Sequence, residues 1–333
     1  MQSIHAGGEE VSIEVGPPKT ARFPSFTAIL HNNMSLLLFI LAAVVVFAAV
    51  FVPHVFQLTN IANVLRMVSI VGLVALGETL VLLTGEIDLS VGSIMSLSLA
   101  MGGIFLHWGS GPALAVTCLT GLLLGLINGI AVALGRVSSL IMTLGTLSIY
   151  GGLANVVAGG QASYLYGLDA YLWTGKGYLL GIPIPVVIFI TAVIACSIML
   201  GCSKAGRTVY FTGANQIAAW YSGIGVERVK IAVFGCAGLF AAMAGPMFAS
   251  QTNRVTPIQG AGFELSAIAI AVLGGTALEG ARGNVVGTLI GALIYGLLLN
   301  ILSLSGVGTY MEQVLKGVML IAIVLAFQNI RRR

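Results

Sequence analysis

The chain has 333 residues, of which 58% are hydrophobic and only 8% are charged, with a formal net charge of +4. Because soluble domains carry about 25% charged residues, this composition excludes an ordinary soluble domain and predicts an integral membrane protein with no nucleic-acid partner. The four cysteines lie in or at the ends of apolar runs and are interpreted as small buried side chains rather than a disulfide framework: Cys118, Cys196, Cys202 and Cys236.

The first 33 residues are polar, and they are predicted to form a cytoplasmic tail that leads into an uncleaved first span. They lack the apolar core and the small-residue cleavage site of a signal peptide. Residues 34–333 are predicted to form one polytopic, all-α permease domain, because apolar runs long enough to cross a bilayer alternate with polar or Gly/Pro breaks. About ten spans are predicted, near residues 34–52, 62–84, 88–107, 112–134, 138–158, 183–201, 229–250, 263–279, 284–304 and 310–328.

The distribution of Lys and Arg predicts the orientation, because these residues collect in short cytoplasmic loops. With the N-terminus inside, most cations are cytoplasmic, whereas three fall outside (Arg66, Lys176 and Arg254) and Lys316 lies within the last span. Both termini are therefore predicted to be cytoplasmic. The aromatic stretch 161–181 then faces outward, where Tyr and Trp suit the headgroup region.

The chain also contains a weak internal repeat. "IDLSVGSI" at 87–94 is echoed by "FELSAIAI" at 263–270, and the spacing from Asn128 to Gly145 recurs from Asn300 to Gly317. In the predicted topology the two copies enter the membrane from opposite sides, which predicts a 5+5 inverted repeat of the kind common in transporters. Chance similarity between two apolar sequences is the alternative.

The chain lacks the motifs of an enzyme. No GxxxxGKS/T phosphate-binding loop is present, and the four histidines are too far apart to suggest a metal site. What stands out instead is a set of polar residues in or beside the predicted spans. An ionised group at the bilayer centre costs about 2.5–3.5 kcal/mol, so such groups usually pair, face the bundle interior or line a pathway. Transport is thus the favoured function. The set is Glu78, Glu86, Asp88, Asn128, Asn155, Glu264, Asn300, Glu312, Gln313 and Lys316.

Each of these polar groups also has a structural interpretation. Asp88 with Ser90, and Glu264 with Ser266, are placed to cap the helices that start there, and capping is the favoured interpretation. Glu86 is expected in the turn at or near the inner surface. Three asparagines are candidates for the pathway wall, with hydrogen bonding between helices as the alternative: Asn128, Asn155 and Asn300.

The longest polar stretch on the predicted cytoplasmic side is 201–230. Within it, "NQIAAWYSGIGV" predicts a short helix with Asn215 as its N-cap and Gly223 at its end. Trp220 and Tyr221 give this helix an apolar face. Docking into a groove of a partner protein is favoured over anchoring at the membrane surface.

Three motifs together carry a family resemblance: "GEIDLSVGS", then "SKAGRTVYFTGANQIAAWYSGI" followed by "VERVKI", and "FELSAIAIAVLGGTALEGARGNVVGTLIGALI". They resemble the membrane permease subunits of bacterial ATP-binding-cassette importers of the ribose and other monosaccharide type. The resemblance runs from about Ser35 to the C-terminus and implies a non-catalytic permease in the cell inner membrane. It also implies three partners, namely a cytoplasmic ATPase dimer, a second permease copy or relative, and a periplasmic sugar-binding protein. No cofactor is expected in this chain, since ATP and Mg²⁺ would bind the ATPase.

By that resemblance, 215–223 matches the coupling helix that docks in the ATPase, and its expected contact residues are Asn215, Gln216, Ala218, Ala219, Trp220 and Gly223. The chain departs from the family where an acidic residue is replaced by Gln216 or Ile217 and a basic one by Trp220. It also has Glu86 where the family more often has glycine.

Two transport alternatives remain. An ion-coupled secondary transporter would use Glu78, Asp88 or Glu264 as a proton or cation site. A branched-chain amino-acid permease belongs to the same importer class and is disfavoured because "IDLSVGS" looks like the sugar branch.

Overall fold

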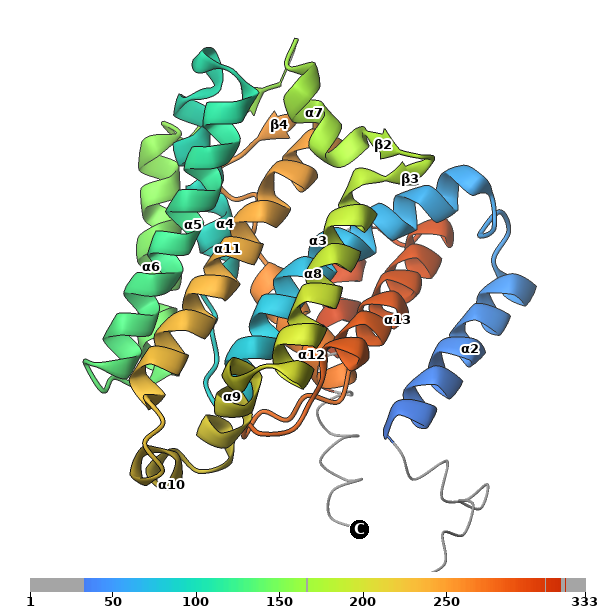
Figure 1. Ribbon diagram of the computed structural model, residues 1–333. Coiled ribbons are helices and arrows are strands. Elements are labelled where there is room, and N and C mark those ends of the chain that lie inside the picture. Colours follow the sequence, from blue (N-terminus) through green and yellow to red (C-terminus); the bar gives the residue numbers. More distant parts are fainter. Residues whose placement is uncertain (1–32, 166, 309, 319–320, 322–333) are drawn as a thin grey trace, which may run out of the picture.

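The structure is a computed structural model that describes residues 33–165, 167–308, 310–318 and 321. Its helices run between two ends of the molecule, which we name after the short helices found there (Figure 1). The α10 end carries α10 (Gln216–Tyr221), and the α7 end carries α7 (Asp169–Lys176). The predicted polar tail lies outside the described residues, apart from its last residue, where α2 begins.

Seven helices in the described part of the chain are long and apolar enough to cross a membrane. They are α2 (Asn33–Phe51), α3 (Leu58–Leu83), α5 (Ser110–Ala133), α6 (Ser139–Val157), α8 (Ile184–Cys202), α11 (Val226–Thr252) and α13 (Val285–Leu304). Shorter helices are α4 (Val91–Ile104), the 3-10 turn η1 (Leu106–Trp108), α9 (Lys204–Ala214) and α12 (Phe263–Leu273). The last predicted span, 310–328, begins within the described residues and ends outside them, so the count of about ten spans stays a prediction.

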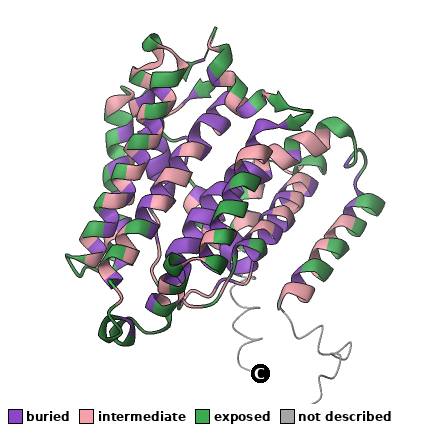
Figure 2. Ribbon diagram, viewed as in Figure 1, coloured by how far each residue is buried: buried purple, intermediate pink, exposed green. Residues whose placement is uncertain are grey.

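The buried residues of α3, α4 and α11 form much of the core of the bundle, where buried positions gather in Figure 2. Every residue of α3 from Val68 to Leu83 is buried. Small residues allow α3 and α11 to approach, since a Cβ at Gly77 would lie 2.8 Å from the Cα of Ala237. The glycines of "GLLLGLING" on α5 lie in the same way against α11, so these two backbones also approach closely.

Two helices are shorter than the sequence predicted. The span expected at 88–107 is helical only from Val91 to Ile104, and the span expected at 263–279 only from Phe263 to Leu273. Residues 85–90 and 253–262 approach these helices without regular helical structure. The predicted bounds miss the start of α4, because residues 88–90 are not helical, and the end of α12, because residues 274–279 form turns and irregular backbone.

The two short helices belong to two halves of opposite orientation. The residues just before α4 and the loop just after α12 both lie at the α10 end. The helix α4 therefore runs away from that end, and α12 runs toward it. The packing is reciprocal: α3 contacts α12 and α13 of the second half, and α11 contacts α4 and α5 of the first. The predicted inverted repeat is therefore present in the fold.

The α7 end carries four strands of two residues each. β1 (Ser163–Tyr164) pairs antiparallel with β4 (Arg254–Val255), and β2 (Tyr178–Leu179) pairs with β3 (Ile182–Pro183). Three cations lie at this end: Arg66, Lys176 and Arg254. The α10 end carries six of the described cations: Arg136, Lys204, Arg207, Arg228, Lys230 and Arg282.

Candidate translocation and coupling sites

The turn that leads into α4 is held by a buried carboxylate. The Asp88 Oδ1 atom accepts hydrogen bonds from the Ser90 N–H at 2.8 Å and the Ser90 hydroxyl at 2.6 Å, while the Asp88 N–H donates to Glu78 Oε1 at 3.2 Å. All three side chains are fully buried. Of the predicted pair, Ser90 is the N-cap residue of α4, whereas Asp88 closes the turn before the helix and accepts from the Ser90 N–H instead of from first-turn N–H groups.

Two further helices join this network through Asn128. The Asn128 Nδ2 group on α5 donates to Ser90 Oγ at 2.7 Å, and the Tyr150 hydroxyl on α6 donates to Asn128 Oδ1 at 3.1 Å. Asn128 is fully buried, so the geometry favours the alternative of hydrogen bonding between helices over a place on the pathway wall. One oxygen each of Glu78 and Asp88 is buried without a hydrogen-bond partner.

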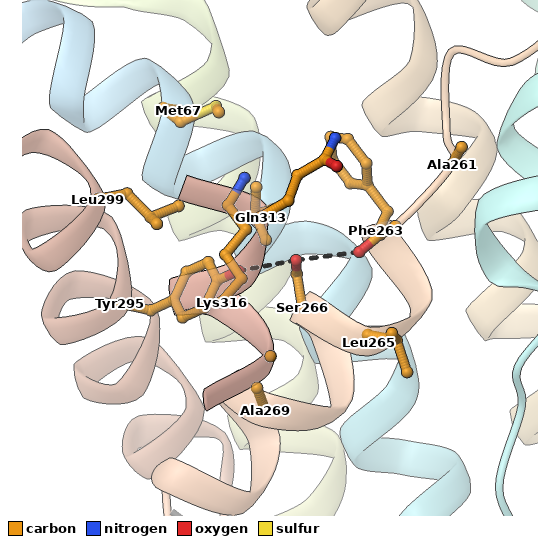
Figure 3. A pocket seen from close by; sticks show the side chains of 13 residues that line it. Met67, Ala261, Phe263, Leu265, Ser266, Ala269, Tyr295, Leu299, Gln313 and Lys316 are labelled. Carbon is orange, nitrogen blue, oxygen red and sulfur yellow. Dashed lines mark hydrogen bonds between the residues drawn. The ribbon is translucent and has the colours of Figure 1, made fainter. Parts of the chain in front are cut away.

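The second short helix begins differently. Its N-cap is Gly262, which has φ of +86°, and the Glu264 Oε1 atom reaches back to accept from the Gly262 N–H at 3.0 Å. The Ser266 hydroxyl donates to the Gly262 carbonyl at 3.0 Å and shares a 2.8 Å hydrogen bond with the Tyr295 hydroxyl on α13 (Figure 3). Glu264 lies in the first turn of α12, as the capping interpretation predicted, but the N-cap residue is Gly262, and neither Glu264 nor Ser266 accepts from a first-turn N–H group.

The N-terminal ends of α4 and α12 meet inside the bundle. The backbones of Gly92 and Gly260 touch, and a Cβ at either residue would overlap the other's carbonyl oxygen. The Gly260 N–H donates to Ser96 Oγ at 2.9 Å, which joins the loop before α12 to the first half of the chain. Two broken helices that meet within a bundle are typical of transporter sites, because their ends offer unpaired backbone groups to a substrate.

Two cavities flank the start of α12, and Ala261 lines both. The smaller, about 210 Å³, is lined by the polar side chains Ser93, Ser96, Asn155 and Glu264. The larger, about 400 Å³, is mainly apolar, and its polar side chains are Ser266, Tyr295, Gln313 and Lys316 (Figure 3). Hydroxyl, amide and carboxylate groups in partly apolar walls suit an uncharged, hydroxyl-rich solute.

The structure does not bring the three candidate asparagines together. Asn300 exchanges two hydrogen bonds with Asn60 on α3, at 2.9 and 3.0 Å, and therefore joins two helices. Asn155 donates within its own helix to the Gly151 carbonyl at 2.9 Å, and its exposed side chain lines the smaller cavity. Of the three, only Asn155 borders a cavity at the start of α12.

The predicted short helix in the loop 201–230 is present as α10. Asn215 is its N-cap and accepts from the Ala218 N–H at 3.0 Å. Gly223, with φ of +79°, follows the end of the helix. Helices often end at a residue in the left-handed region, and glycine adopts that conformation with the least strain. The helix points a hydrophobic face into solvent, with exposed fractions of 71% for Ile217, 58% for Trp220 and 79% for Tyr221, while Ala219 is buried.

The base of α10 is tied to the segment before α4 by charges that sequence reasoning did not connect. Lys230 Nζ on α11 lies 2.6 Å from Glu86 Oε1 and also donates to Gln216 Oε1 at 3.0 Å. Gln216 Nε2 lies 3.5 Å from the same Glu86 oxygen. We call these three residues the Glu86 cluster. The predicted topology had placed all three residues on one side of the membrane. It could not pair Glu86 with Lys230, because several other cations were predicted on the same side.

A second junction ties α9 to both halves. The Ala281 N–H donates to the Leu83 carbonyl at 3.0 Å, and the Tyr210 hydroxyl of α9 donates to the Gly283 carbonyl at 2.9 Å. Gly213 fits against this contact so tightly that a Cβ there would lie 2.6 Å from the Ala281 nitrogen. The loop that carries α10 thus contacts the end of α3 and the segment that follows α12.

Together, the apolar helices, the two broken helices and the anchored apolar-faced α10 define a membrane transport subunit. Comparison with known proteins agrees. Residues 60–324 match the family described as the permease component of the branched-chain amino acid transport system, and the chain belongs to this permease family.

Relatives named as sugar permeases align with most of the chain. Ribose import permease protein RbsC of Bacillus subtilis (strain 168) is 41% identical over 86% of this chain and 89% of its own length. RbsC of Escherichia coli (strain K12) is 38% identical over 82% of this chain and 87% of its own. D-allose transport system permease protein AlsC of the same strain is 33% identical over 86% and 89%.

A solved structure described as an inward-facing conformation of a metal-chelate type ABC transporter aligns with a TM-score of 0.55 over 90% of this chain and 100% of that chain. Its sequence identity is 12%, so the likeness concerns the fold alone.

Proposed function

We propose that this chain is the membrane-spanning permease subunit of an ATP-driven, binding-protein-dependent importer that carries a monosaccharide of the ribose type across the bacterial inner membrane. The observation that carries the proposal is α10, a capped helix outside the bundle whose base is tied to the segment before α4, while the preceding helix α9 contacts the segment after α12. The relatives named as ribose and D-allose permeases support the substrate class.

The expected partner at α10 is a cytoplasmic ATPase dimer that binds ATP and Mg²⁺. Ile217, Trp220 and Tyr221 are exposed side by side on six residues of helix, and the Trp220 and Tyr221 rings lie 5.1 Å apart in an edge contact. Amphipathic helices of this kind dock into apolar grooves. The excess of Lys and Arg at the α10 end supports a cytoplasmic position for that end and for both termini.

The opposite end is the expected docking face for a periplasmic sugar-binding protein. It presents the loops 161–181 and 250–262, and the second of these leads directly into α12. A sugar released there would pass along the start of α12 between the two cavities. ATP and loaded binding protein would each favour a different state of the permease, as differential affinity requires. A second permease copy or relative would complete the pathway.

Ion coupling is a second candidate, because Glu78 and Asp88 each bury an oxygen without a hydrogen-bond partner. Such a transporter would work without nucleotide and would fail when the ion gradient collapses. The exposed, anchored α10 has no role in that mechanism, which is why the importer is preferred.

The test is to purify the chain gently from its native membrane and identify the chains that accompany it. We expect a subunit with a phosphate-binding loop to accompany the wild type, and to be lost in Trp220→Glu and Gly223→Arg. The matched control is Trp173→Glu, a half-exposed tryptophan on α7 at the opposite end, which should keep the subunit. Purification of the wild type alone, with sugar transport in liposomes without nucleotide, would instead establish ion coupling.

A further inference from the structure

The Glu86 cluster joins three elements that are far apart in the sequence. Glu86 lies in the irregular segment between α3 and α4, Gln216 is the first residue of α10, and Lys230 lies in the second turn of α11. The Glu86 and Lys230 side chains are each only 12% exposed, so water screens their 2.6 Å ion pair poorly. An ion pair in this setting is costly to break, because either partner alone would keep a partly buried, unpaired charge.

Glu86 is also close in the chain to the turn that starts α4. Asp88, two residues later, binds Ser90, the N-cap of α4, through its side chain. The first turn of α4 then carries Gly92, whose backbone touches Gly260 before α12. A continuous run of short contacts therefore leads from the base of α10 to the point where the two broken helices meet.

Space beside the cluster would allow α10 to move. A cavity of about 370 Å³ is lined by all three cluster residues together with Arg136, Ser138 and Glu227. Of these last three, Arg136 and Glu227 are charged, and they face the cluster from the α5–α6 loop and from the first turn of α11, respectively. By contrast, the other attachment of the loop, at Gly213 and Ala281, is packed backbone against backbone with no room for a Cβ. The ion pair is thus the attachment with freedom to shift.

We propose that Glu86 is a positioning residue that transmits displacement of α10 to the start of α4, with Lys230 and Gln216 as its partners. The proposal rests on the proposed function, since a docked ATPase would supply the displacement. Removing the Glu86 charge would leave the ATPase able to bind and hydrolyse ATP, but would weaken the link between hydrolysis and the pathway. A role limited to folding would lower assembly and leave the ratio of transport to hydrolysis unchanged.

The experiment uses the complete complex with its ATPase and binding protein in liposomes, and measures the amount of radiolabelled ribose carried per ATP hydrolysed. For Glu86→Gln we expect this ratio to fall about fivefold while ATP hydrolysis is retained. A factor of about five lies near the lower end of the range over which one site usually changes another. The double variant Glu86→Lys with Lys230→Glu, which exchanges the two charges, should recover most of the lost transport per ATP. The matched control is Glu227→Gln, which removes a carboxylate that lines the same cavity and should leave the ratio unchanged.

A second readout reports on the pathway itself. In a background in which the four native cysteines are replaced, Asn155→Cys places a thiol beside the smaller cavity. Its labelling rate should change on addition of ATP in the wild-type context and should stop responding when Glu86→Gln is added. Should Glu86→Gln fail to assemble, Gln216→Ala is measured in its place, with the same fall in ratio expected.

An unchanged ratio in an assembled Glu86→Gln or Gln216→Ala complex, or an ATP response of the thiol that persists, would overturn the proposal. Failure of the proposed function looks different, because the wild type would then show no ATP-dependent uptake at all.

Discussion

The backbones of Gly92 and Gly260 lie in direct contact, although the two residues are 168 positions apart in the chain. Gly92 lies in the first turn of α4, and Gly260 lies just before α12. Each glycine leaves no room for a Cβ on the other. This contact joins the starts of the two broken helices, one from each half of the chain.

A methyl group at this contact should therefore be poorly tolerated. For Gly92→Ala and for Gly260→Ala we expect the free energy of unfolding to fall by about 1–3 kcal/mol, the usual cost of overpacking, and uptake to be lost. Thermal unfolding of the detergent-purified protein measures the first effect, and sugar uptake measures the second.

The matched control is Gly103→Ala, near the other end of α4. A Cβ there meets nothing within 4 Å, and alanine is the better helix former by about 1 kcal/mol. We expect this variant to be as stable as the wild type or more so. If Gly92→Ala behaved like Gly103→Ala, the two broken helices would not meet as described.

Asp88 offers a prediction that separates structure from ion coupling. In Asp88→Ala the buried N–H and hydroxyl of Ser90 lose their acceptor, and we expect a loss of about 1–3 kcal/mol in the free energy of unfolding. Asp88→Asn keeps an acceptor oxygen and should retain most of the stability and uptake. Abolished uptake in a stable Asp88→Asn protein would point instead to a carboxylate that carries a proton or cation.

Asn300 should behave as a residue that joins helices. Its exchange of two hydrogen bonds with Asn60 is worth about 1 kcal/mol by the scale of hydrogen bonds between membrane helices. We expect Asn300→Ala to lower the melting temperature modestly and to leave uptake per folded molecule unchanged. Because both residues serve one interaction, the stability losses of Asn300→Ala and Asn60→Ala should not add in the double variant. Additive losses would contradict the pairing.

The features that sequence predicted best depend on short-range chemistry. Asn215 and Gly223 predicted α10 because an N-cap side chain and a left-handed glycine act within one or two helical turns. The resemblance between 87–94 and 263–270 predicted the inverted halves, which the fold contains.

The features that sequence missed depend on long-range contacts. The lengths of α4 and α12 were overestimated because the irregular backbone beside them is held by contacts with other segments, such as Asp88 with Glu78 and Ala281 with Leu83. Glu86 could not be assigned to Lys230 because their contact spans 144 positions, from 86 to 230, and several other cations lie at the same end. For Asn128 the sequence left the pathway wall and hydrogen bonding between helices both open, because its partners, Ser90 and Tyr150, come from two other segments.

Asn155 is the asparagine that we expect to act on the transported sugar. Its side chain is exposed and lines the smaller cavity, and its hydrogen bond to Gly151 stays within α6. Asn155→Leu should therefore leave the melting temperature unchanged and lower the initial rate of ribose uptake about tenfold, which corresponds to about 1.4 kcal/mol and hence to one well-made hydrogen bond. The matched control is Val156→Leu, an exposed neighbour that does not line the cavity, which should leave uptake unchanged. Equal uptake by the two variants would exclude Asn155 from the pathway, whereas a lowered melting temperature would assign it a role in folding.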